Sequence, residues 1–596
     1  MSFHPNDVIR RGRVATVIVC GALAFLLSAF FRTQVLRNQV WMLQSEENRL
    51  REVPLPAPRG VILDRNNKPI AENVVGYSVA LLAPSEDTLR ATLTRLRRTI
   101  ELTNRQFEDA IKRYRRDKAR PTVIVPDASF DVVSVLEEHR MDYPSLIIQS
   151  SPKRIYPAGK AVGAFVGYIS EINEQELANL SSLGYKPGQQ IGKSGLEKQY
   201  EQRLRGREGV QFVEVDARNR VVRNGGARED ILPQGAPPLY TNIDVDLQQY
   251  IETLFGDTLA GGAVAMVPQT GEVLAIYSSP GVDPNRWVGG VPASYYDSLR
   301  NDPRHPLFNK ALQGTYPPGS TWKLATTIMG LQNGVVKMTD RMPEPCTGYY
   351  YFGNRVFRCW DKNGHGYLDL SGAIAKSCDV YFYQLGQKIG LSRLVAGGVA
   401  LGFARKSGID LPEESKPRFP DRYPEYFNEK YGPRGWTNSI VISMAIGQGD
   451  DSQTILSMAR FYSALATDGW EPTPEVARGK PQRTRVFNLP PDQLLQIRAA
   501  LAGVVSAGGT AGSAALSGVQ LAGKTGTAQS GRFTPTGTEL NDAWFVGFAP
   551  ANDPKIVVAV MLEYVPFHGT VSARIASQII GHYLHVPVAS AVQTEG

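Results

Sequence analysis

The sequence predicts an α+β protein with a single N-terminal membrane-spanning helix, an elongated domain and a larger C-terminal domain built on one sheet. Three observations lead to this prediction. An uncharged apolar run occupies residues 14–31, and a proline-rich linker at residues 233–238 divides the remaining chain. Strand patterns at 262–277 and 518–565 enclose a mainly helical stretch, which is typical of one sheet with an inserted helical region.

Composition excludes several classes of protein. The 596 residues are enough for several domains, and a hydrophobic fraction of 42% is ordinary for a folded chain. The net charge is +8, and the sequence contains no run of five Lys or Arg. It therefore lacks the clustered basic residues that are typical of a nucleic-acid-binding protein. Four cysteines are too few for a disulfide-built scaffold. No nucleic-acid partner is expected.

The apolar run from Val14 to Phe31 contains no charged residue, and its length reaches the lower limit for crossing a bilayer. Arg10, Arg11 and Arg13 precede it, which predicts a cytoplasmic N-terminus with all later residues outside. A cleaved signal peptide is the alternative, but its apolar core is usually about 7–15 residues long and is followed by small residues. We therefore expect an uncleaved anchor in the inner (cytoplasmic) membrane, with the C-terminal domain on the outer, periplasmic side.

The rest of the chain divides where composition changes. Residues 33–235, here called the pedestal, carry strand and helix patterns but no plausible nucleophile–base pair. Within them, the charged stretch 85–118 predicts a helix with a solvated face. The expected boundaries are 1–13 for a cytoplasmic tail, 14–32 for the anchor, 33–235 for the pedestal, 236–590 for the C-terminal domain and 591–596 for a tail.

A candidate nucleophile lies at a predicted helix start. Pro317, Pro318 and Gly319 cannot continue a helix, so a helix is expected to begin near Ser320. Ser320 and Lys323 are three residues apart and would share one helix face. A serine becomes nucleophilic beside a base, and a lysine can be that base when its pKa is lowered.

Order and spacing distinguish this pair from chance matches. A second Ser-x-x-Lys starts at Ser150, but Pro152 argues against a helix there. Ser320 is followed, in order along the chain, by Ser377-Cys378-Asp379 and then by Lys524-Thr525-Gly526-Thr527 on a predicted strand. The series Ser-x-x-Lys, Ser-x-Asp/Asn, Lys-Thr-Gly is shared by the penicillin-interacting enzymes.

Nearly the whole chain, beginning with its single anchor, resembles the class B penicillin-binding proteins, most of all those of the elongation type. Asp379 supports the elongation type, because division-type relatives usually carry asparagine there. The other segments that carry the resemblance are Arg59-Gly60 with Asp64-Arg65, Gly195-Leu196-Glu197 with Leu204-Arg205-Gly206, and Ile446-Gly-Gln-Gly449. The resemblance implies a penicillin-binding transpeptidase domain in which helices flank an antiparallel sheet.

The resemblance also implies a function. The chain would be a D,D-transpeptidase that cross-links peptidoglycan stem peptides through a serine acyl-enzyme during cell elongation, that β-lactams target, and that needs no cofactor for its chemistry. The alternatives are a D,D-carboxypeptidase, a division-type transpeptidase and a non-catalytic β-lactam sensor or scaffold. The implied partner is a membrane glycosyltransferase of the SEDS family, RodA type.

The resemblance assigns a role to each motif residue. The implied roles are nucleophile for Ser320, proton acceptor for Lys323, proton relay for Ser377, ordering of that network or of the substrate for Asp379, binding of the terminal carboxylate for Lys524 and Thr525, close approach of the substrate at Gly526, and an oxyanion-hole N–H at Thr527.

Three of the four cysteines fall in one short span with a histidine: Cys346, Cys359, His365 and Cys378. A Cys₃His set suits tetrahedral zinc, although this spacing is not that of a standard zinc finger. The alternatives are a Cys346–Cys359 disulfide with Cys378 free, in an oxidising envelope, or three unpaired thiols. Because some relatives carry a zinc ligand at the middle position of Ser-x-Asp, the resemblance favours a structural zinc at these four residues.

Overall fold

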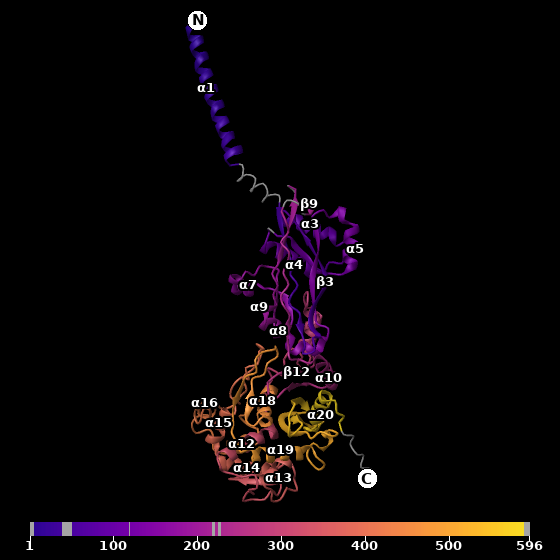
Figure 1. The fold of residues 1–596 in the computed structure, drawn as a ribbon, viewed down its shortest axis with the longest axis vertical. Coiled ribbons are helices and arrows are strands. Elements are labelled where there is room, and N and C mark those ends of the chain that lie inside the picture. Colours follow the sequence, from indigo (N-terminus) through magenta and orange to yellow (C-terminus); the bar gives the residue numbers. More distant parts are fainter. Residues whose placement is uncertain (1–4, 38–49, 119, 217–220, 225–227, 589–596) are drawn as a thin grey trace.

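The computed structural model describes residues 5–37, 50–118, 120–216, 221–224 and 228–588. The molecule is a rod (Figure 1): helix α1 (Pro5–Phe31) forms one end, the pedestal lies in the middle, and the C-terminal domain forms the opposite end. The predicted C-terminal tail, residues 591–596, lies outside the described residues.

The predicted N-terminal apolar helix is confirmed. α1 continues into a π-helical turn, Arg32–Leu36, and the apolar span of the two is not buried against the rest of the protein. In the described part of the chain, this is the only helix long and apolar enough to cross a bilayer. An isolated helix with so much exposed apolar surface requires an apolar surrounding, which is what a single membrane anchor has.

The pedestal is organised around one long strand, β3, which runs along the rod. β5 pairs with β3 over most of its length, and β4 and β2 pair with other parts of it. Helices α3 and α4 pack on this sheet through Leu89, Leu93 and Ile111. The helical pattern expected over 85–118 is confirmed, but the segment forms two helices, because Thr103 caps a new one, and each has one buried face.

The pedestal elements fall between the anchor and the linker. Its strands are β1 (Leu50–Leu55), β2 (Ile62–Leu63), β3 (Pro69–Leu81), β4 (Thr122–Ala128), β5 (Leu146–Ile155), β6 (Ile169–Glu171), β7 (Gln190–Gly192), β8 (Gly209–Val215) and β9 (Val221–Asn224). Its helices are α3 (Glu86–Leu96), α4 (Asn104–Arg116), α5 (Phe130–Glu138), α6 (Gly163–Val166), α7 (Glu174–Leu180), α8 (Gly195–Gln199) and α9 (Glu201–Leu204).

The C-terminal domain is built on one five-stranded antiparallel sheet in the order β12-β11-β19-β18-β17. The predicted α+β architecture is confirmed, because β11 and β12 come from the start of the domain and β17 to β19 from its end. β11 and β12 are buried along their whole length, since α18 packs on one face of the sheet and α10 and α20 on the other. β17 is the edge strand of this sheet, so one of its sides is free to receive a ligand.

The elements of this domain include a small hairpin, β13–β14, that the helical pattern of the middle region did not predict. The strands are β10 (Leu239–Tyr240), β11 (Gly261–Met266), β12 (Val273–Ser279), β13 (Tyr349–Phe352), β14 (Arg355–Arg358), β15 (Trp470–Pro472), β16 (Arg483–Arg485), β17 (Ala522–Phe533), β18 (Glu539–Ala549) and β19 (Ile556–Val565). The helices are α10 (Val245–Phe255), α11 (Ala293–Asn301), α12 (Lys323–Gln332), α13 (Leu370–Ala375), α14 (Asp379–Ile389), α15 (Leu391–Ala400), α16 (Glu425–Tyr431), α17 (Ile440–Met444), α18 (Ile455–Ala466), α19 (Pro491–Val505) and α20 (Thr570–Leu584).

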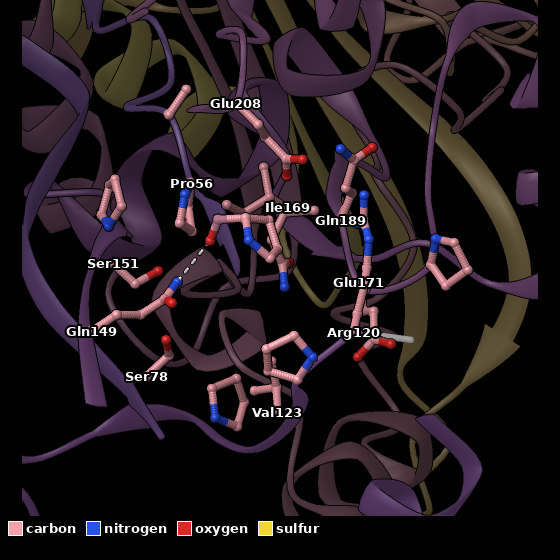
Figure 2. A pocket seen from close by; sticks show the side chains of 18 of the residues that line it. Pro56, Ser78, Arg120, Val123, Gln149, Ser151, Ile169, Glu171, Gln189 and Glu208 are labelled. Atoms are coloured by element: carbon pink, nitrogen blue, oxygen red, sulfur yellow. Dashed lines mark hydrogen bonds between the residues drawn. The ribbon is translucent and has the colours of Figure 1, made fainter. Parts of the chain in front are cut away.

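A buried ion network joins two pedestal segments that the sequence singled out. Glu197, which is fully buried, receives Arg59 Nε at 2.5 Å and Arg154 Nε at 2.8 Å. The same region reaches the C-terminal domain, because Tyr200 donates its hydroxyl to Asp410 at 2.6 Å. Beside the network the pedestal holds a cavity of about 250 Å³, in which Gln149 and Ser151 lie across from Glu171 (Figure 2). The network of Arg59, Arg154 and Glu197 therefore lies close to the contact between the pedestal and the C-terminal domain.

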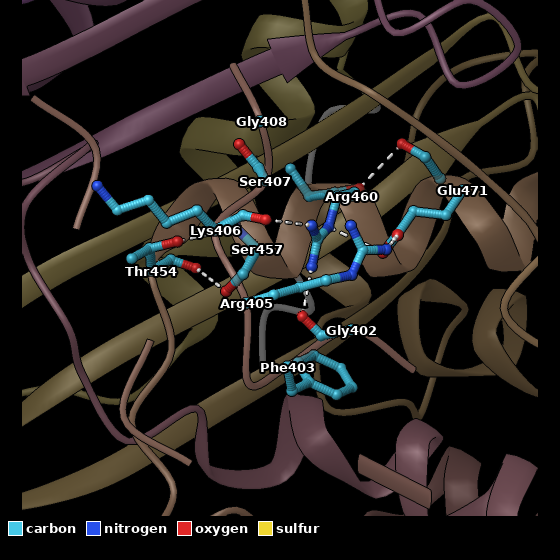
Figure 3. A network of polar contacts seen from close by, with 12 residues as sticks. Gly402, Phe403, Arg405, Lys406, Ser407, Gly408, Thr454, Ser457, Arg460 and Glu471 are labelled. Atoms are coloured by element: carbon cyan, nitrogen blue, oxygen red, sulfur yellow. Dashed lines mark hydrogen bonds and ion pairs between the residues drawn. The ribbon is translucent and has the colours of Figure 1, made fainter. Parts of the chain in front are cut away.

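A second buried network fixes α18 under the sheet (Figure 3). Arg460 of α18 is almost fully buried, and its guanidinium lies 2.8 Å from Glu471 while donating to the carbonyl of Gly402 at 2.7 Å. Two residues further along α18, the hydroxyl of Tyr462 donates to the carbonyl of Thr321 at 3.0 Å. The network thus holds the helix that supports the turn carrying the candidate nucleophile.

Candidate active site

Ser320 lies in a 3₁₀ turn, Gly319–Trp322, that leads directly into α12. The predicted helix start at this position is confirmed, with the difference that its first turn is 3₁₀. Gly319 has a φ of +54° and donates its N–H to the carbonyl of Gly447 at 2.9 Å. A Cβ on Gly447 would lie 2.4 Å from the carbonyl oxygen of Gly319. The Ile446–Gly449 segment therefore supports the Gly319–Trp322 turn, here called the nucleophile turn after its candidate nucleophile Ser320, through backbone contacts that only glycine permits.

Lys323 is fully buried and bonds to the second motif, Ser377-Cys378-Asp379, rather than to Ser320 of its own motif. Its ammonium donates to Asp379 Oδ1 at 2.7 Å, to the carbonyl of Ser377 at 2.8 Å and to Ser377 Oγ at 3.2 Å. The expected direct contact between Ser320 Oγ and Lys323 is absent from the hydrogen bonds of the described residues. This does not remove either residue as a candidate, because catalytic hydrogen bonds often tighten only when substrate binds.

Ser377 bridges the two lysines of the site. Its hydroxyl lies 3.2 Å from Nζ of Lys323 and 2.8 Å from Nζ of Lys524. Its φ of +54° is unusual for a residue with a side chain, and such strained positions concentrate at functional sites. Asp379 accepts from the other direction, since its Oδ2 receives the backbone N–H of Trp360 at 3.1 Å.

Lys524 reaches this cluster from the edge strand β17. It is fully buried, and it donates to Ser377 Oγ and to the carbonyl of Thr525 at 3.1 Å. Burial lowers the pKa of Lys524 well below its usual value, the nearby charge of Lys323 lowers it further, and Asp379 opposes the shift. The site therefore places a readily deprotonated lysine beside the bridging serine hydroxyl.

The remaining residues of the third motif line the edge of the sheet. Thr525 and Thr527 are partly exposed, and Thr525 shares a hydrogen bond of 2.9 Å with Thr510. A Cβ on Gly526 would lie 2.8 Å from the carbonyl oxygen of Pro318 and 3.0 Å from Cγ2 of Thr321. Glycine at 526 thus lets β17 approach the nucleophile turn, a reason that differs from the room for substrate expected from the resemblance.

The cysteine–histidine cluster is brought together next to the second motif. The ligand atoms of Cys346, Cys359, His365 and Cys378 all lie within 4.8 Å of one another. Nδ1 of His365 is 3.5 Å from the sulfurs of Cys346 and Cys359. Every described cysteine has a free thiol, so the Cys346–Cys359 disulfide is not formed here. Hydrogen bonding from Cys378 and His365 lowers the pKa of Cys359.

This donor set fits a tetrahedral zinc ion. Three sulfurs and one imidazole nitrogen converge within one small buried space, and their convergence is what a structural zinc site requires. The other ring nitrogen of His365 is buried without a hydrogen bond and lies 3.9 Å from Asp361, the kind of carboxylate that often orients a metal-bound histidine. Cys378 stands between Ser377 and Asp379, so a bound ion would also fix the second motif.

Sequence reasoning missed several residues that shape the site. The backbone N–H of Trp360, the hydroxyl of Thr510 and the packing at Gly447 all act through contacts between segments far apart in the chain. Trp544 is a further example, because its indole N–H donates to the carbonyl of Pro317 at 3.0 Å and holds β18 against the nucleophile turn. Only the Gly-Gln-Gly pattern at 447–449 left a signal in the sequence.

Comparison with known proteins agrees with this geometry. Residues 261–581 match the penicillin binding protein transpeptidase domain family, and residues 54–231 match the penicillin-binding protein dimerisation domain family. Peptidoglycan D,D-transpeptidase MrdA of Acinetobacter baumannii is 33% identical, over 97% of this chain and 88% of its own. MrdA of Escherichia coli is 31% identical, over 96% of this chain and 94% of its own.

Solved structures show the same architecture. Penicillin-binding protein PBP2 of Helicobacter pylori, in complex with MreC, has a TM-score of 0.77 and 26% identity, over 90% of this chain and 99% of its own. PBP2 of Pseudomonas aeruginosa, in complex with WCK 5153, has a TM-score of 0.67 and 29% identity, over 91% of this chain and 99% of its own. The chain therefore belongs to the class B penicillin-binding proteins, of the penicillin-binding protein 2 type.

Proposed function

We propose that this protein is a peptidoglycan D,D-transpeptidase that cross-links stem peptides during cell elongation, with Ser320 as its nucleophile. The observation that carries the proposal is the meeting of three distant segments at one sheet edge: Lys524 Nζ and Lys323 Nζ both contact Ser377 Oγ, and the turn of Ser320 packs on β17. The family membership and the MrdA relatives support the same activity.

In the acylation step, the donor stem peptide lies along the free side of β17 with its terminal carboxylate at Lys524 and Thr525. Ser320 Oγ attacks the carbonyl carbon between the two terminal D-alanines, and its proton passes to Nζ of Lys323. The N–H groups of Ser320 and Thr527 stabilise the oxyanion. As the C–N bond breaks, the Ser377 hydroxyl gives a proton to the leaving D-alanine nitrogen and is reprotonated from Lys323.

The acyl-enzyme is resolved by an amine of a neighbouring stem. The amine attacks the ester carbon, its proton returns through Ser377 and Lys323, and Ser320 leaves with its hydroxyl restored. Asp379 orders the relay through its bonds to Lys323 and to the N–H of Trp360. A β-lactam acylates Ser320 in the same way as the donor peptide, and the resulting acyl-enzyme persists.

The test is a cross-linking assay on lipid-linked precursor, with and without a SEDS-type glycosyltransferase. The expected product is cross-linked stem peptide, and Ser320→Ala should abolish it. Release of D-alanine without cross-links would identify a D,D-carboxypeptidase instead. Neither product, with penicillin still bound, would identify a sensor or scaffold.

The proposed partner is a glycosyltransferase of the SEDS family, RodA type, and the pedestal and anchor are the proposed contact. One solved relative, with a TM-score of 0.69 and 27% identity over 98% of this chain and 100% of its own, was described as structural coordination of polymerization and crosslinking by a peptidoglycan synthase complex. Charge reversal at exposed pedestal residues, Arg98→Glu or Lys198→Glu, should lower polymerisation by the partner while penicillin still labels the protein. Unchanged polymerisation in both variants would favour a passive spacer.

We also propose that the catalytic domain lies on the outer side of the inner membrane. The charged residues Arg10, Arg11 and Arg13 at the start of the apolar span support a cytoplasmic N-terminus.

The proposed zinc ligands are Cys346, Cys359, His365 and Cys378. The ion would be structural, fixing the loop of the second motif and the β13–β14 hairpin without entering the chemistry.

A further inference from the structure

The β13–β14 hairpin and the loop after it carry an exposed aromatic surface close to the active site. Large apolar side chains are exposed at five positions between residues 349 and 367: Tyr349, Tyr351, Val356, Trp360 and Tyr367. Tyr351 is 62% exposed and Trp360 is 57% exposed, and a cluster of exposed apolar side chains marks a binding surface more often than a single one does. None of the proposed catalytic steps uses these side chains.

The hairpin attaches to the domain through one face only. Side chains alternate between the two faces of a strand, and Tyr350 packs inward against Tyr383 of α14, with 6.3 Å between the ring centroids. On the opposite face, the rings of Tyr349 and Tyr351 lie 5.3 Å apart, and Val356 stands across from Tyr351 in the register of the hairpin. These three residues are here called the hairpin face. Because the inward side chains hold the hairpin in place, the hairpin face is free to bind a ligand.

Basic side chains accompany the hairpin face without being paired. Arg355, Arg358 and Lys362 are exposed, and none of them forms an ion pair with another described residue. Asp361 is the one acidic residue between 349 and 367, and its carboxylate lies 3.9 Å from the ring of His365 instead. The surface therefore combines aromatic rings with uncompensated positive charge, which favours a ligand that has both apolar ring faces and anionic groups.

The hairpin lies at the end of the molecule that is farthest from the anchor. It packs on α14, and α13 and α14 lie at the end of the rod opposite α1 (Figure 1). A lipid surface, or a partner embedded in the bilayer, is out of reach of this end while α1 is anchored. The ligand that a membrane-anchored transpeptidase meets at this end is the peptidoglycan of the cell wall.

Trp360 connects the hairpin to the catalytic residues. It lies two residues beyond Arg358, the last residue of β14, and its indole N–H donates to the carbonyl of Lys376 at 3.1 Å. Its backbone N–H donates to Oδ2 of Asp379, also at 3.1 Å. Because Lys376 directly precedes Ser377, a polymer bound at the hairpin face is held close to the second motif, from which its stem amines can reach the acyl-enzyme.

We propose that the hairpin face binds the glycan strand that carries the acceptor stem peptide. The C–H faces of its sugar rings stack on Tyr349 and Tyr351, and carboxylates of its stems pair with Arg355 and Arg358. The face has far fewer side chains than the roughly 20–30 residues that each partner contributes to a typical stable protein interface, so a linear polymer fits it better than a folded protein does. The proposal rests on the proposed transpeptidase function and adds the surface that holds its acceptor.

The experiment measures the binding of soluble, uncross-linked glycan strands with stem peptides to the full-length protein in detergent, after penicillin has acylated it. Acylation blocks the donor site, so the remaining binding reports a separate surface. We expect Tyr351→Ala to raise the Kd about 2- to 10-fold, the range of one aromatic contact, and Tyr351→Phe to stay within about 2-fold of the wild type. Tyr296→Ala, at an exposed tyrosine of the same domain outside the hairpin, is the matched control and should bind like the wild type.

Strands stripped of their stem peptides separate the sugar contacts from the charge contacts. Tyr351→Ala should weaken the binding of stripped and intact strands alike, because the ring contacts the sugars. Arg355→Gln should weaken the binding of intact strands only, since stripped strands have lost the stem carboxylates. Binding of stripped strands that does not depend on Tyr351 would overturn the assignment of the hairpin face to the glycan.

Tm reports whether each variant is folded. No strand binding by the acylated wild type, or equal binding by folded Tyr351→Ala, would overturn the proposal, and the transpeptidase function would stand if the unacylated wild type still cross-links. A dimer that Tyr351→Ala abolishes while strand binding is unchanged would assign the face to a second copy of the chain, which also overturns it. Failure of penicillin to label the wild type would count against the proposed function and this proposal together.

Discussion

Nζ of Lys524 lies 2.8 Å from Oγ of Ser377, although the two residues are 147 positions apart in the chain. This contact joins the edge strand of the sheet to the turn before α14 and places one hydroxyl between two lysines. In the proposed mechanism this geometry lets a proton pass between Lys323 and Ser377 across a single hydrogen bond.

The relay predicts the behaviour of two substitutions at one position. Ser377→Ala and Ser377→Gly both remove the hydroxyl, so both should slow acylation by penicillin about 10²- to 10⁴-fold, the usual range for a lost proton-transfer group. Because Ser377 has a φ of +54°, Ser377→Gly should have the higher Tm of the two. Stopped-flow acylation and thermal unfolding test both statements. Normal acylation by either variant would remove Ser377 from the relay.

The pH dependence of stability should reveal Asp542. The pKa of this carboxyl is about 6 in the folded protein against 3.8 for an ordinary aspartate. Between these two pH values the carboxyl is therefore more often protonated in the native state than in the unfolded state. Stability contributed by this group therefore falls as pH rises from about 4 to 6 and stays low above. Besides burial, Glu563 raises the pKa, while Arg532 and the N–H of Tyr564 lower it.

The matching substitution is Asp542→Asn, which removes this titration. The variant should be more stable than the wild type at pH 7.5, by about 1–3 kcal/mol, and equal to it near pH 3.5. Urea unfolding at the two pH values measures the difference. A variant that is less stable at pH 7.5 would show that the carboxylate is compensated in the native state.

The zinc proposal predicts a metal content and a thermal effect. Protein purified without added metal should contain about one zinc per chain by elemental analysis. Cys359→Ser should lose the ion, lower the Tm and slow penicillin acylation, because Cys378 lies between Ser377 and Asp379. Cys20→Ser, at an exposed position of α1, is the matched control and should change neither. A peptide map with Cys346 joined to Cys359, and no zinc, would establish the disulfide instead.

The pedestal network predicts an asymmetry between buried and exposed ion pairs. Glu197→Gln leaves Arg154 buried without a carboxylate and Arg59 with Glu201 alone, and should cost about 3–5 kcal/mol of pedestal stability. Glu137→Gln breaks an exposed pair with Arg140 and should cost less than about 1 kcal/mol. Denaturant unfolding compares the two variants. Equal costs would mean that the network does not hold the pedestal together.

Local patterns were sufficient to predict much of this molecule. The apolar run predicted α1, the Pro-Pro-Gly break predicted the helix that starts near Ser320, and short apolar runs predicted the strands of the large sheet. These features depend on residues close in sequence, where propensity and periodicity act directly.

The remainder depends on contacts that no local pattern encodes. Lys323 was expected to meet Ser320 because they share a helix face, yet its ammonium turns to Ser377 and Asp379, which provide three acceptors. The role of Gly447 and the burial of Asp542 follow from how distant strands and loops pack. Cys346, Cys359, His365 and Cys378 were predicted as a possible zinc set from their residue types alone, and the fold brings their ligand atoms together.

The identity of the nucleophile is the central claim, and mass spectrometry of the penicillin-treated protein tests it most directly. The account predicts one penicillin adduct per chain, on the peptide that contains Ser320. Ser320→Ala should carry no adduct at nearly unchanged Tm, while Ser150→Ala, at the other Ser-x-x-Lys sequence, should be labelled like the wild type. An adduct on any other residue, or undiminished labelling of Ser320→Ala, would contradict the account.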